Sequence, residues 1–218
     1  MIAQFYENKI FPWALKLADR AFRRQREEVL SRASGRVLEI GVGSGISLPF
    51  YSTAVSELVG IEPSQALRDK CQDVEHGFHD SRLSIEHGDA QALTYPDESF
   101  DAVVAFLVFC TIPDPEAAAR EVYRVLKPGG KLFFLEHVSA MTEGMGEGRH
   151  SALKIARLQE RLNPFWKKIS CGCNLNRDTG QLFLDQGFHF QDYQAYHHPG
   201  IIRFVAPVIQ GCAFKPEV

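Results

Sequence analysis

The chain has 218 residues, of which 45% are hydrophobic and 23% are charged, and its formal net charge is −3 at pH 7. A chain of this length can bury one sizeable core and fold as a single domain without disulfide bonds. The slightly acidic balance argues against nucleic acid as the main partner, because such partners select a basic face. We therefore expect a globular domain that acts on small molecules.

Cysteine usage and the apolar runs indicate where the protein works. The five cysteines are odd in number and scattered, and the chain opens without the order of segments that marks a signal peptide. The longest apolar run, residues 102–112, is much shorter than the ~20 residues that a membrane helix requires. These observations predict a protein of the reducing cytoplasm without a membrane-spanning helix.

The first elements in chain order are helical. Residues 2–33 carry apolar side chains near helical spacing with arginines among them, which predicts one or two amphipathic helices divided at Pro12. From residue 36 onward, short apolar runs alternate with helix-like segments, and these runs are RVLEIGV, SELVGIEP, RLSIEHGD, DAVVAFLVF and KLFFLEHV. The alternation favours a mostly parallel sheet covered by helices on both faces.

The later elements complete this pattern. The segment DPEAAAREVYRVLKPGG has acidic residues early and a Lys-Pro-Gly-Gly stop, which predicts a helix between the fourth and fifth runs. Glycine-rich residues 142–148 lead into a basic helix around ALKIARLQERL, and a further helix follows NRDTG. Two strand-like runs separated by Pro199-Gly200 predict an antiparallel pair at the edge of the sheet.

A glycine-rich turn follows the first predicted strand. Gly41, Gly43 and Gly45 allow the backbone to approach a ligand where a β-carbon would collide. A dinucleotide fingerprint places its third glycine three residues after the second, whereas here the third comes two residues after. The spacing therefore disfavours a nicotinamide oxidoreductase, which remains the alternative enzyme class.

Three acidic residues near predicted strand ends describe the ligand. Glu39 stands two residues before the first glycine, where a carboxylate would repel a pyrophosphate but suits the ammonium group of an amino acid. Glu62 ends the second strand and can chelate two ribose hydroxyls. Asp89 ends the third strand, where its carboxylate could accept from an adenine amino group. Adenine, ribose and an amino acid together describe S-adenosylmethionine.

From about residue 35 to 137 the chain resembles the class I methyltransferases. The segments LEIGVGSG, IEPS, GDAQALTYPDESFDAVV and REVYRVLKPGGKLFFLEHV occur in the order of that family. The resemblance implies a Rossmann-like, doubly wound α/β fold with S-adenosylmethionine as cofactor. It also implies a helical lid at residues 1–34 over a methyltransferase domain at 35–218, in a single domain overall. The implied cofactor-binding residues are Glu39, Gly41, Gly43, Gly45, Glu62, Pro63, Asp89, Ala90 and Phe106.

A narrower resemblance concerns the methyl acceptor. The segments FLVFCTIPDP, FFLEHV and NPFWKKISCGCNLNRDT look like the small alkyl-thiol methyltransferases and their bacterial relatives, whose neighbours methylate quinone precursors and phospholipid head groups. The resemblance implies an acceptor pocket near residues 166–177. The expected pocket residues are Tyr6, Trp13, Phe109, Trp166, Cys171 and Cys173. Phe109 could equally belong to the core, and the two lid aromatics could simply pack.

His137, at the carboxyl end of the fifth predicted strand, is the candidate catalytic base; alternatively it fixes a loop by bonding to backbone. Because side chains alternate along a strand, Glu136 and His137 cannot both point into one pocket. A thiol with a pKa of about 8.5 is partly ionised at neutral pH, whereas a phenol near ~10 needs a stronger base. We therefore favour a small, rather apolar thiol as acceptor, with a quinone precursor or a phospholipid head group as the alternative.

Other features leave alternatives open. Cys171 and Cys173 have no second pair and predict no metal site. Residues 1–36 hold eight Lys or Arg against four acids, so this helical region presents either a solvated face or a contact with an anionic membrane surface. A non-catalytic module that only binds the donor is a further alternative, and the oligomeric state stays undetermined.

Overall fold

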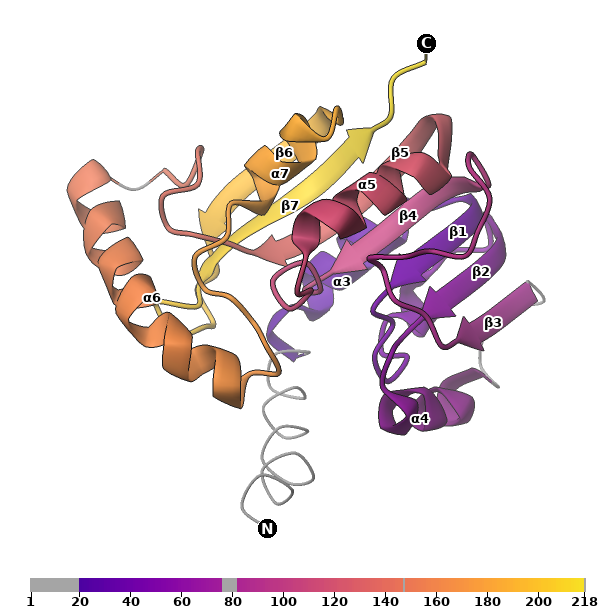
Figure 1. The fold of residues 1–218 in the computed structure, drawn as a ribbon, viewed down its shortest axis with the longest axis horizontal. Helices are drawn as coiled ribbons and strands as arrows, with labels where there is room; N and C mark the ends of the chain where they lie inside the picture. The colour runs from indigo at the N-terminus through magenta and orange to yellow at the C-terminus, as the bar shows by residue number, and fades with distance from the viewer. Residues whose placement is uncertain (1–19, 76–81, 147, 218) are drawn as a thin grey trace.

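The computed structural model describes residues 20–75, 82–146 and 148–217, and Figure 1 shows its ribbon. Tyr6, Trp13 and the break expected at Pro12 lie outside the described residues. Within the described part of the chain, no helix combines the length and the apolar character needed to cross a membrane.

Within these residues, seven strands form one sheet in the order β3-β2-β1-β4-β5-β7-β6. β1 to β5 pair in parallel, whereas β7 runs antiparallel to both β5 and β6. The predicted doubly wound, mostly parallel sheet with an antiparallel C-terminal edge is therefore confirmed. The strands are β1 Gly35–Ile40, β2 Val55–Ile61, β3 Arg82–Glu86, β4 Phe100–Phe106, β5 Leu126–His137, β6 His189–His197 and β7 Pro207–Phe214.

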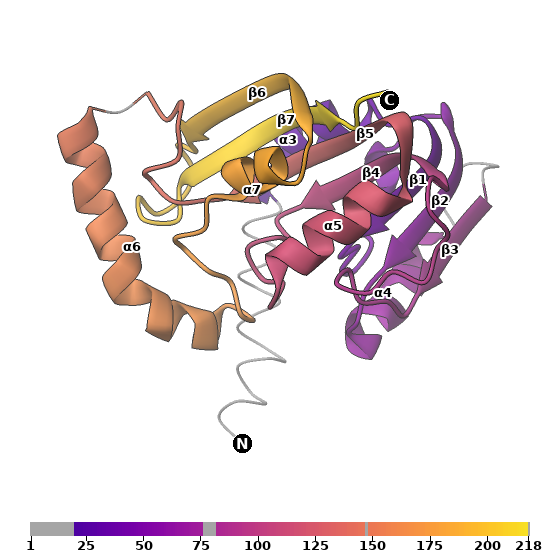
Figure 2. The same cartoon turned by 45° about the horizontal axis from the view of Figure 1, so that its top comes forward.

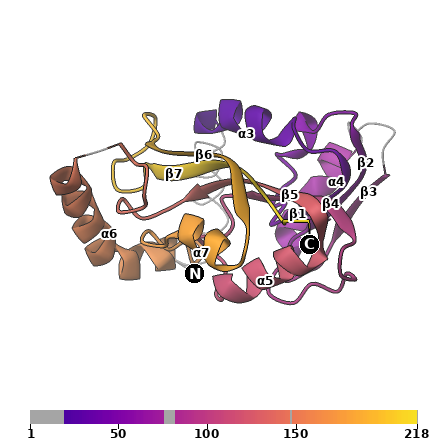
Figure 3. The same ribbon diagram turned by 90° about the horizontal axis from the view of Figure 1, so that it is seen from above.

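Helices cover both faces of this sheet. Figure 3 shows α3 on one face and α5 and α7 on the other, and α6 lies beyond the carboxyl end of β5 (Figures 1 and 2). The helices that the structure describes are α3 Arg23–Leu30, α4 Gln65–Glu75, α5 Pro115–Val125, α6 Arg149–Ile169 and α7 Thr179–Asp185, with a short 3-10 helix η2 at Leu48–Phe50.

Local signals in the sequence account for α5. Asp114 caps the helix, because its side chain accepts a hydrogen bond from the Ala117 amide at 2.9 Å. Pro115 occupies the first turn, where its missing amide hydrogen costs nothing. The helix ends at Val125, and the predicted Lys-Pro-Gly-Gly stop instead forms the first part of β5, which begins at Leu126.

Two hydrophobic clusters occupy the two faces of the sheet. Along β5, Phe133 and Leu135 belong to the cluster under α3, whereas Phe134 belongs to the cluster under α5 and α7. Phe109 also lies in the second cluster, fully buried, with its ring centroid 5.0 Å from that of Phe183. Phe109 therefore packs in the core, as the alternative interpretation expects, and its place in the acceptor pocket stays a prediction.

Two basic residues of the region around α3 contact other parts of the protein. The Arg26 guanidinium is buried and lies 4.3 Å from the centroid of the Phe106 ring. Arg32 forms an ion pair with Asp192 across to β6. A helix that faced solvent or a membrane would point such charges outward, whereas these two residues contact other parts of the protein.

Candidate functional site

The glycine-rich turn lies at the carboxyl end of β1. Gly41, Gly43 and Gly45 have φ angles of +69°, +59° and +78°, which glycine adopts without a steric penalty. A Cβ on Gly41 would lie 2.5 Å from the Val108 side chain, whereas one on Gly43 would meet nothing closer than the Gly41 carbonyl oxygen at 4.0 Å. Gly41 is thus required by packing, and Gly43 leaves its side of the turn open to a ligand.

Glu62 connects the end of β2 to this turn. Its Oε2 accepts a hydrogen bond from the Gly43 amide at 3.2 Å, and its Oε1 accepts one from the Ser64 amide at 2.9 Å. The side chain is buried. The carboxylate expected to bind ribose hydroxyls is therefore held directly beside Gly43.

Glu39 is buried in β1 next to the turn. The Tyr51 hydroxyl donates a hydrogen bond to its Oε2 at 3.0 Å. Burial raises the pKa of Glu39, while hydrogen bonds from Ser47 and Tyr51 and the charge of Arg26 oppose that rise. Arg26 and Tyr51 escaped the sequence analysis. The helical spacing of Phe22, Arg26 and Val29 was the available signal, because it places Arg26 on the apolar stripe of α3.

The third acid lies at the end of β3. Asp89 is exposed, and its Oδ1 accepts hydrogen bonds from the Gln91 amide at 2.9 Å and from the Gln91 side chain at 2.8 Å. Ala90 beside it is buried, and Pro63 after β2 is exposed. These residues follow neighbouring strands of the sheet, as predicted, and they face the end at which parallel sheets of this type bind ligands.

A second group of polar side chains lies at the carboxyl ends of β4 and β5. Glu136 Oε1 accepts hydrogen bonds from the amides of Val108 and Phe109, each at 3.0 Å. Leu107 has a φ of +55°, a left-handed conformation that leucine rarely adopts, and this turns the loop toward β5. Burial raises the pKa of Glu136 to about 8. Glu136 thus acts as a positioning residue for the loop that carries Cys110.

His137, the last residue of β5, is buried at the same end. Neither of its ring nitrogens has an oxygen or nitrogen hydrogen-bond partner among the described residues. Cys173 lies against it: a hydrogen bond from the Cys110 thiol, followed by interactions with His137 and Trp166, lowers the pKa of Cys173. The hydrogen bond to Cys173 and burial raise the pKa of Cys110.

The loop at residues 170–178 is fastened to both strands. The Asn174 amide donates a hydrogen bond to the Cys110 carbonyl at 2.7 Å, and the Ser139 amide donates one to the Arg177 carbonyl at 2.8 Å. The Arg177 guanidinium donates to the Phe109 carbonyl. Among the predicted pocket residues, Trp166 and Cys173 are therefore brought to His137, whereas Cys171 is exposed on the same loop. Cys110 and Arg177 were missed, although both lie in segments quoted for the resemblance.

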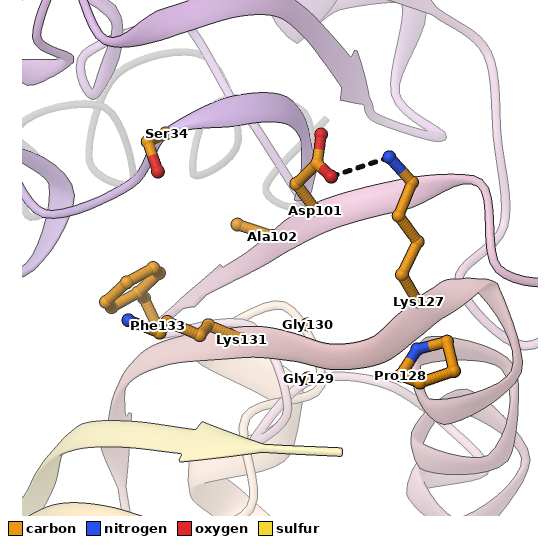
Figure 4. Close-up of a pocket in the computed structure, with 9 residues that line it drawn as sticks. All are labelled: Ser34, Asp101, Ala102, Lys127, Pro128, Gly129, Gly130, Lys131 and Phe133. Atoms are coloured by element: carbon orange, nitrogen blue, oxygen red, sulfur yellow. Dashed lines mark hydrogen bonds and ion pairs between the residues drawn. The ribbon is translucent and has the colours of Figure 1, made fainter. Parts of the chain in front are cut away.

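A pocket of about 200 Å³ lies at the opposite end of the strands (Figure 4). The side chains of Asp101 and Lys127 form an ion pair across it at 2.6 Å. In open parallel sheets, ligands bind at the carboxyl ends of the strands. This pocket is consequently separate from the glycine turn and from the His137 cluster.

Comparisons with known proteins agree with this geometry. The family described as "Methyltransferase domain" matches residues 38–134. Thiol S-methyltransferase TMT1B of Rattus norvegicus is 32% identical, over 82% of this chain and 70% of that protein. Phosphatidylethanolamine N-methyltransferase of Cereibacter sphaeroides is 37% identical, over 56% of this chain and 60% of that protein. The second match thus spans less than two thirds of that relative's length.

Among solved structures, a S-adenosylmethionine-dependent methyltransferase of Thermotoga maritima superposes with a TM-score of 0.66. It is 22% identical, and the match covers 99% of this chain and 100% of that one, so it supports the fold alone. Fold and site together define a class I methyltransferase that uses S-adenosylmethionine as its cofactor. The chain belongs to the methyltransferase family that includes the thiol S-methyltransferases TMT1A and TMT1B.

The residues at the glycine turn fit this cofactor. The open side of Gly43 forms a cradle that a side chain would fill. Buried carboxylates at Glu39 and Glu62 flank it, and within the described residues no cationic side chain is hydrogen-bonded or paired to the Glu62 carboxylate. Such an arrangement suits an ammonium group and ribose hydroxyls better than a pyrophosphate.

Proposed function

We propose that this methyltransferase transfers a methyl group to the sulfur of a small, rather apolar thiol. The observation that carries the proposal is the buried His137 ring beside Cys173 and Trp166, at the same end of the sheet as the glycine turn. The identity of the TMT1 relatives as thiol S-methyltransferases supports it. S-adenosylmethionine, when bound, supplies a methyl group activated on a sulfonium.

The donor would be held by the residues of the glycine turn and its neighbours. The Gly43 backbone admits close approach, Glu62 would bind the ribose hydroxyls, and Glu39 would face the ammonium group. Asp89 would accept from the adenine amino group, while Pro63, Ala90 and Phe106 would complete the walls. The contact of Arg26 with Phe106 supports a role for residues 1–34 as a lid over this site.

His137 would take the proton of the acceptor. Because its nitrogens are not engaged by other oxygen or nitrogen atoms of the described residues, one of them is free to accept a proton from a thiol. The proposed base faces the side of the sheet opposite to Glu136, since consecutive side chains of β5 alternate. Holding the sulfur in line with the methyl group supplies most of the acceleration, so the base adds a smaller share.

The test is transfer of labelled methyl groups to thiols, quinols and amino lipids by the wild type and by His137→Ala. We expect thiol methylation at pH 7 to fall by about 10-fold to 100-fold in the variant and to recover above the pKa of the thiol. His150→Ala, on the exposed surface of α6, serves as the matched control. Binding of S-adenosylhomocysteine, measured by calorimetry, should be the same in all three proteins.

A phospholipid head group is the second candidate acceptor, favoured by the phosphatidylethanolamine N-methyltransferase relative. Transfer to amino lipids or quinols but not to thiols would replace the thiol assignment. Product binding without transfer to any acceptor would favour a non-catalytic donor-binding module. We also propose a reducing cytoplasm as the location of the protein, on the odd number and scattered positions of the cysteines in the sequence.

A further inference from the structure

Two cysteines from distant parts of the chain meet beside His137. Cys110 lies in the loop after β4, Cys173 lies in the loop after α6, and their side chains interact. Asn174 fastens the two loops, because its backbone amide and its side-chain amide both donate to the Cys110 carbonyl, at 2.7 and 3.0 Å. The two loops that carry the cysteines are therefore fastened to each other by hydrogen bonds to the Cys110 backbone.

The surroundings of this pair favour a reactive sulfur. Trp166 Nε1 and both nitrogens of His137 are buried without oxygen or nitrogen partners in the described chain, and both side chains interact with Cys173. Hydrogen-bond donors around a sulfur stabilise its thiolate, which is the form that attacks disulfides. Cys173 is half-buried, so a small reagent can reach it, whereas Cys110 is only 3% exposed.

We propose that Cys110 and Cys173 are a redox modification site that reacts with low-molecular-weight disulfides and closes as an intramolecular disulfide. The Cys173 thiolate attacks one sulfur of the small disulfide, which forms a mixed disulfide and releases one small thiolate. The Cys110 thiol passes its proton to that thiolate, and its sulfur then attacks the Cys173 sulfur and expels the second small thiolate. The protein loses two electrons, and the small disulfide is reduced to one thiol and one thiolate.

Closure of the pair alters the acceptor site. The Cys173 sulfur in a disulfide carries no charge, so it no longer stabilises the neighbouring His137 and Trp166 N–H groups. The inference rests on the proposed function in one respect, because a pocket that admits a small apolar thiol also admits the corresponding disulfide. The enzyme would then be slowed when its acceptor is oxidised.

The experiment treats the full chain with hydroxyethyl disulfide and maps the cross-links by non-reducing digestion and mass spectrometry. We expect a Cys110–Cys173 cross-link, a loss of thiol methylation on the order of 100-fold, and recovery with dithiothreitol. A cross-link in a protein that methylates no thiol would remove the proposed acceptor but keep this site. Absence of the cross-link in protein that still binds S-adenosylhomocysteine would overturn the site.

Single substitutions sharpen the result. Cys110→Ser should stop at the mixed disulfide on Cys173, whereas Cys171→Ser, on the same loop, should close as the wild type does. A cross-link between Cys171 and Cys173 would contradict the pairing. If Cys110→Ser fails to fold, alkylation of the wild type by iodoacetamide at pH 6 gives the second measurement, and Cys173 should react before the buried Cys71 and Cys212.

An independent observation concerns the outer face of α6. Lys154, Leu158, Arg161, Phe165 and Lys168 follow one another at spacings of four and three residues, so they share one face of the helix. Leu158 and Phe165 are 42% and 63% exposed. The face thus alternates basic and exposed apolar side chains, on a chain whose overall net charge is −3.

Two loops bonded to the buried Gln159 of α6 also carry exposed apolar side chains. The Gln159 side chain accepts a hydrogen bond from the Ala140 amide at 2.9 Å and donates one to the Phe204 carbonyl at 3.1 Å. The neighbouring Met141 and Ile202 are 46% and 63% exposed. Four of the six exposed large hydrophobic residues in the described chain therefore lie on α6 or on loops bound to it.

We infer that this face of α6 docks on an anionic lipid surface. Apolar side chains flanked by Lys and Arg match the boundary between acyl chains and anionic head groups. Phe165 precedes Trp166 of the proposed acceptor site, so docking would bring that site to the surface at which apolar acceptors dissolve. A nucleic acid would select the positive charges but not the exposed Leu158 and Phe165.

The test is co-sedimentation with phosphatidylglycerol–phosphatidylcholine vesicles and with phosphatidylcholine vesicles alone. Binding to the anionic vesicles should weaken with salt and fall by about 10-fold or more when Lys154, Arg161 and Lys168 are all replaced by Glu. The matched control replaces the exposed Lys70, Arg82 and Arg120 by Glu, which changes the net charge equally. Equal losses in both triple variants, or none in the α6 variant, would overturn the assignment.

Discussion

The glycine turn after β1 and the cluster at the end of β5 belong to the same end of the sheet but are built differently. The turn is formed by neighbouring residues whose backbone shapes the ligand site, and the Gly43 amide donates a hydrogen bond to Glu62. The cluster is made by side chains from separate segments, with Cys110, His137 and Cys173 far apart in sequence. A backbone site of this kind tolerates variation around it, whereas a side-chain cluster depends on every loop that delivers a member.

The largest expected effect is on the free energy of unfolding, and it tests whether Phe109 belongs to the core or to the acceptor pocket. Phe109→Ala should lower the free energy of unfolding by about 3–5 kcal/mol, because it leaves a cavity beside Phe183. Phe165→Ala on the exposed face of α6 should change it by less than ~0.5 kcal/mol. Urea titration followed by circular dichroism measures both. If Phe109→Ala lowered the free energy of unfolding only slightly, Phe109 would instead be assigned to the acceptor pocket.

The next effect concerns the donor side. Gly43→Val should weaken the binding of S-adenosylhomocysteine by at least about 100-fold, because the side chain fills the open face of the turn. Gly146→Val is the matched control, since Gly146 also has a positive φ, +69°, and a Cβ added to it would meet no atom within 4 Å. Calorimetry should show near wild-type binding in the control. Similar losses in both variants would mean that strain, and not occupancy of the turn, causes the effect.

A third prediction tests the burial of Glu136. Because the folded-state pKa is raised to about 8, the folded chain keeps a proton that the unfolded chain releases near pH 4.5. Wild-type stability from this group is therefore lost as the pH rises from about 4.5 to 8. Glu136→Gln should therefore gain on the order of 3 kcal/mol relative to the wild type between pH 5 and 8.

Glu121→Gln is the control for this titration, because the pKa of Glu121 is shifted in the direction opposite to that of Glu136. The hydrogen bond from Arg124 lowers the pKa of Glu121, so that carboxyl is ionised in both states above pH 5. The stability difference between Glu121→Gln and the wild type should then stay constant from pH 5 to 8. Urea titrations at several pH values measure both differences, and a flat Glu136→Gln profile would contradict the raised pKa.

The smallest expected effect is on the binding of S-adenosylhomocysteine and concerns Glu62. Glu62→Gln keeps an oxygen that can accept from the Gly43 amide but loses the charge, so we expect about 10-fold weaker binding of S-adenosylhomocysteine. Glu57→Gln in the middle of β2, paired with Arg36 at 2.9 Å, should leave binding unchanged. Unchanged affinity in Glu62→Gln would leave the ribose assignment without support.

The sequence predicts those features of the fold and site that depend on neighbouring residues better than those that depend on residues far apart in the chain. The sheet and the glycine turn were predictable because alternating runs and glycine spacing are properties of neighbouring residues. The proximity of Trp166, His137 and Cys173 was expected only through resemblance, since no local pattern links residues so far apart. Arg26 and Tyr51 were missed because their partner, Glu39, reaches them through tertiary packing.

The position of β7 bears on how the chain folds. β6 joins the sheet only through β7, since β7 lies between β5 and β6. The hairpin of β6 and β7 is local, closed by residues 198–206, and can form early, but β5 keeps an unpaired edge until that hairpin docks. The exposed edge is a transient template for pairing with another chain. Aggregation during refolding is therefore expected to depend on how quickly the hairpin reaches β5.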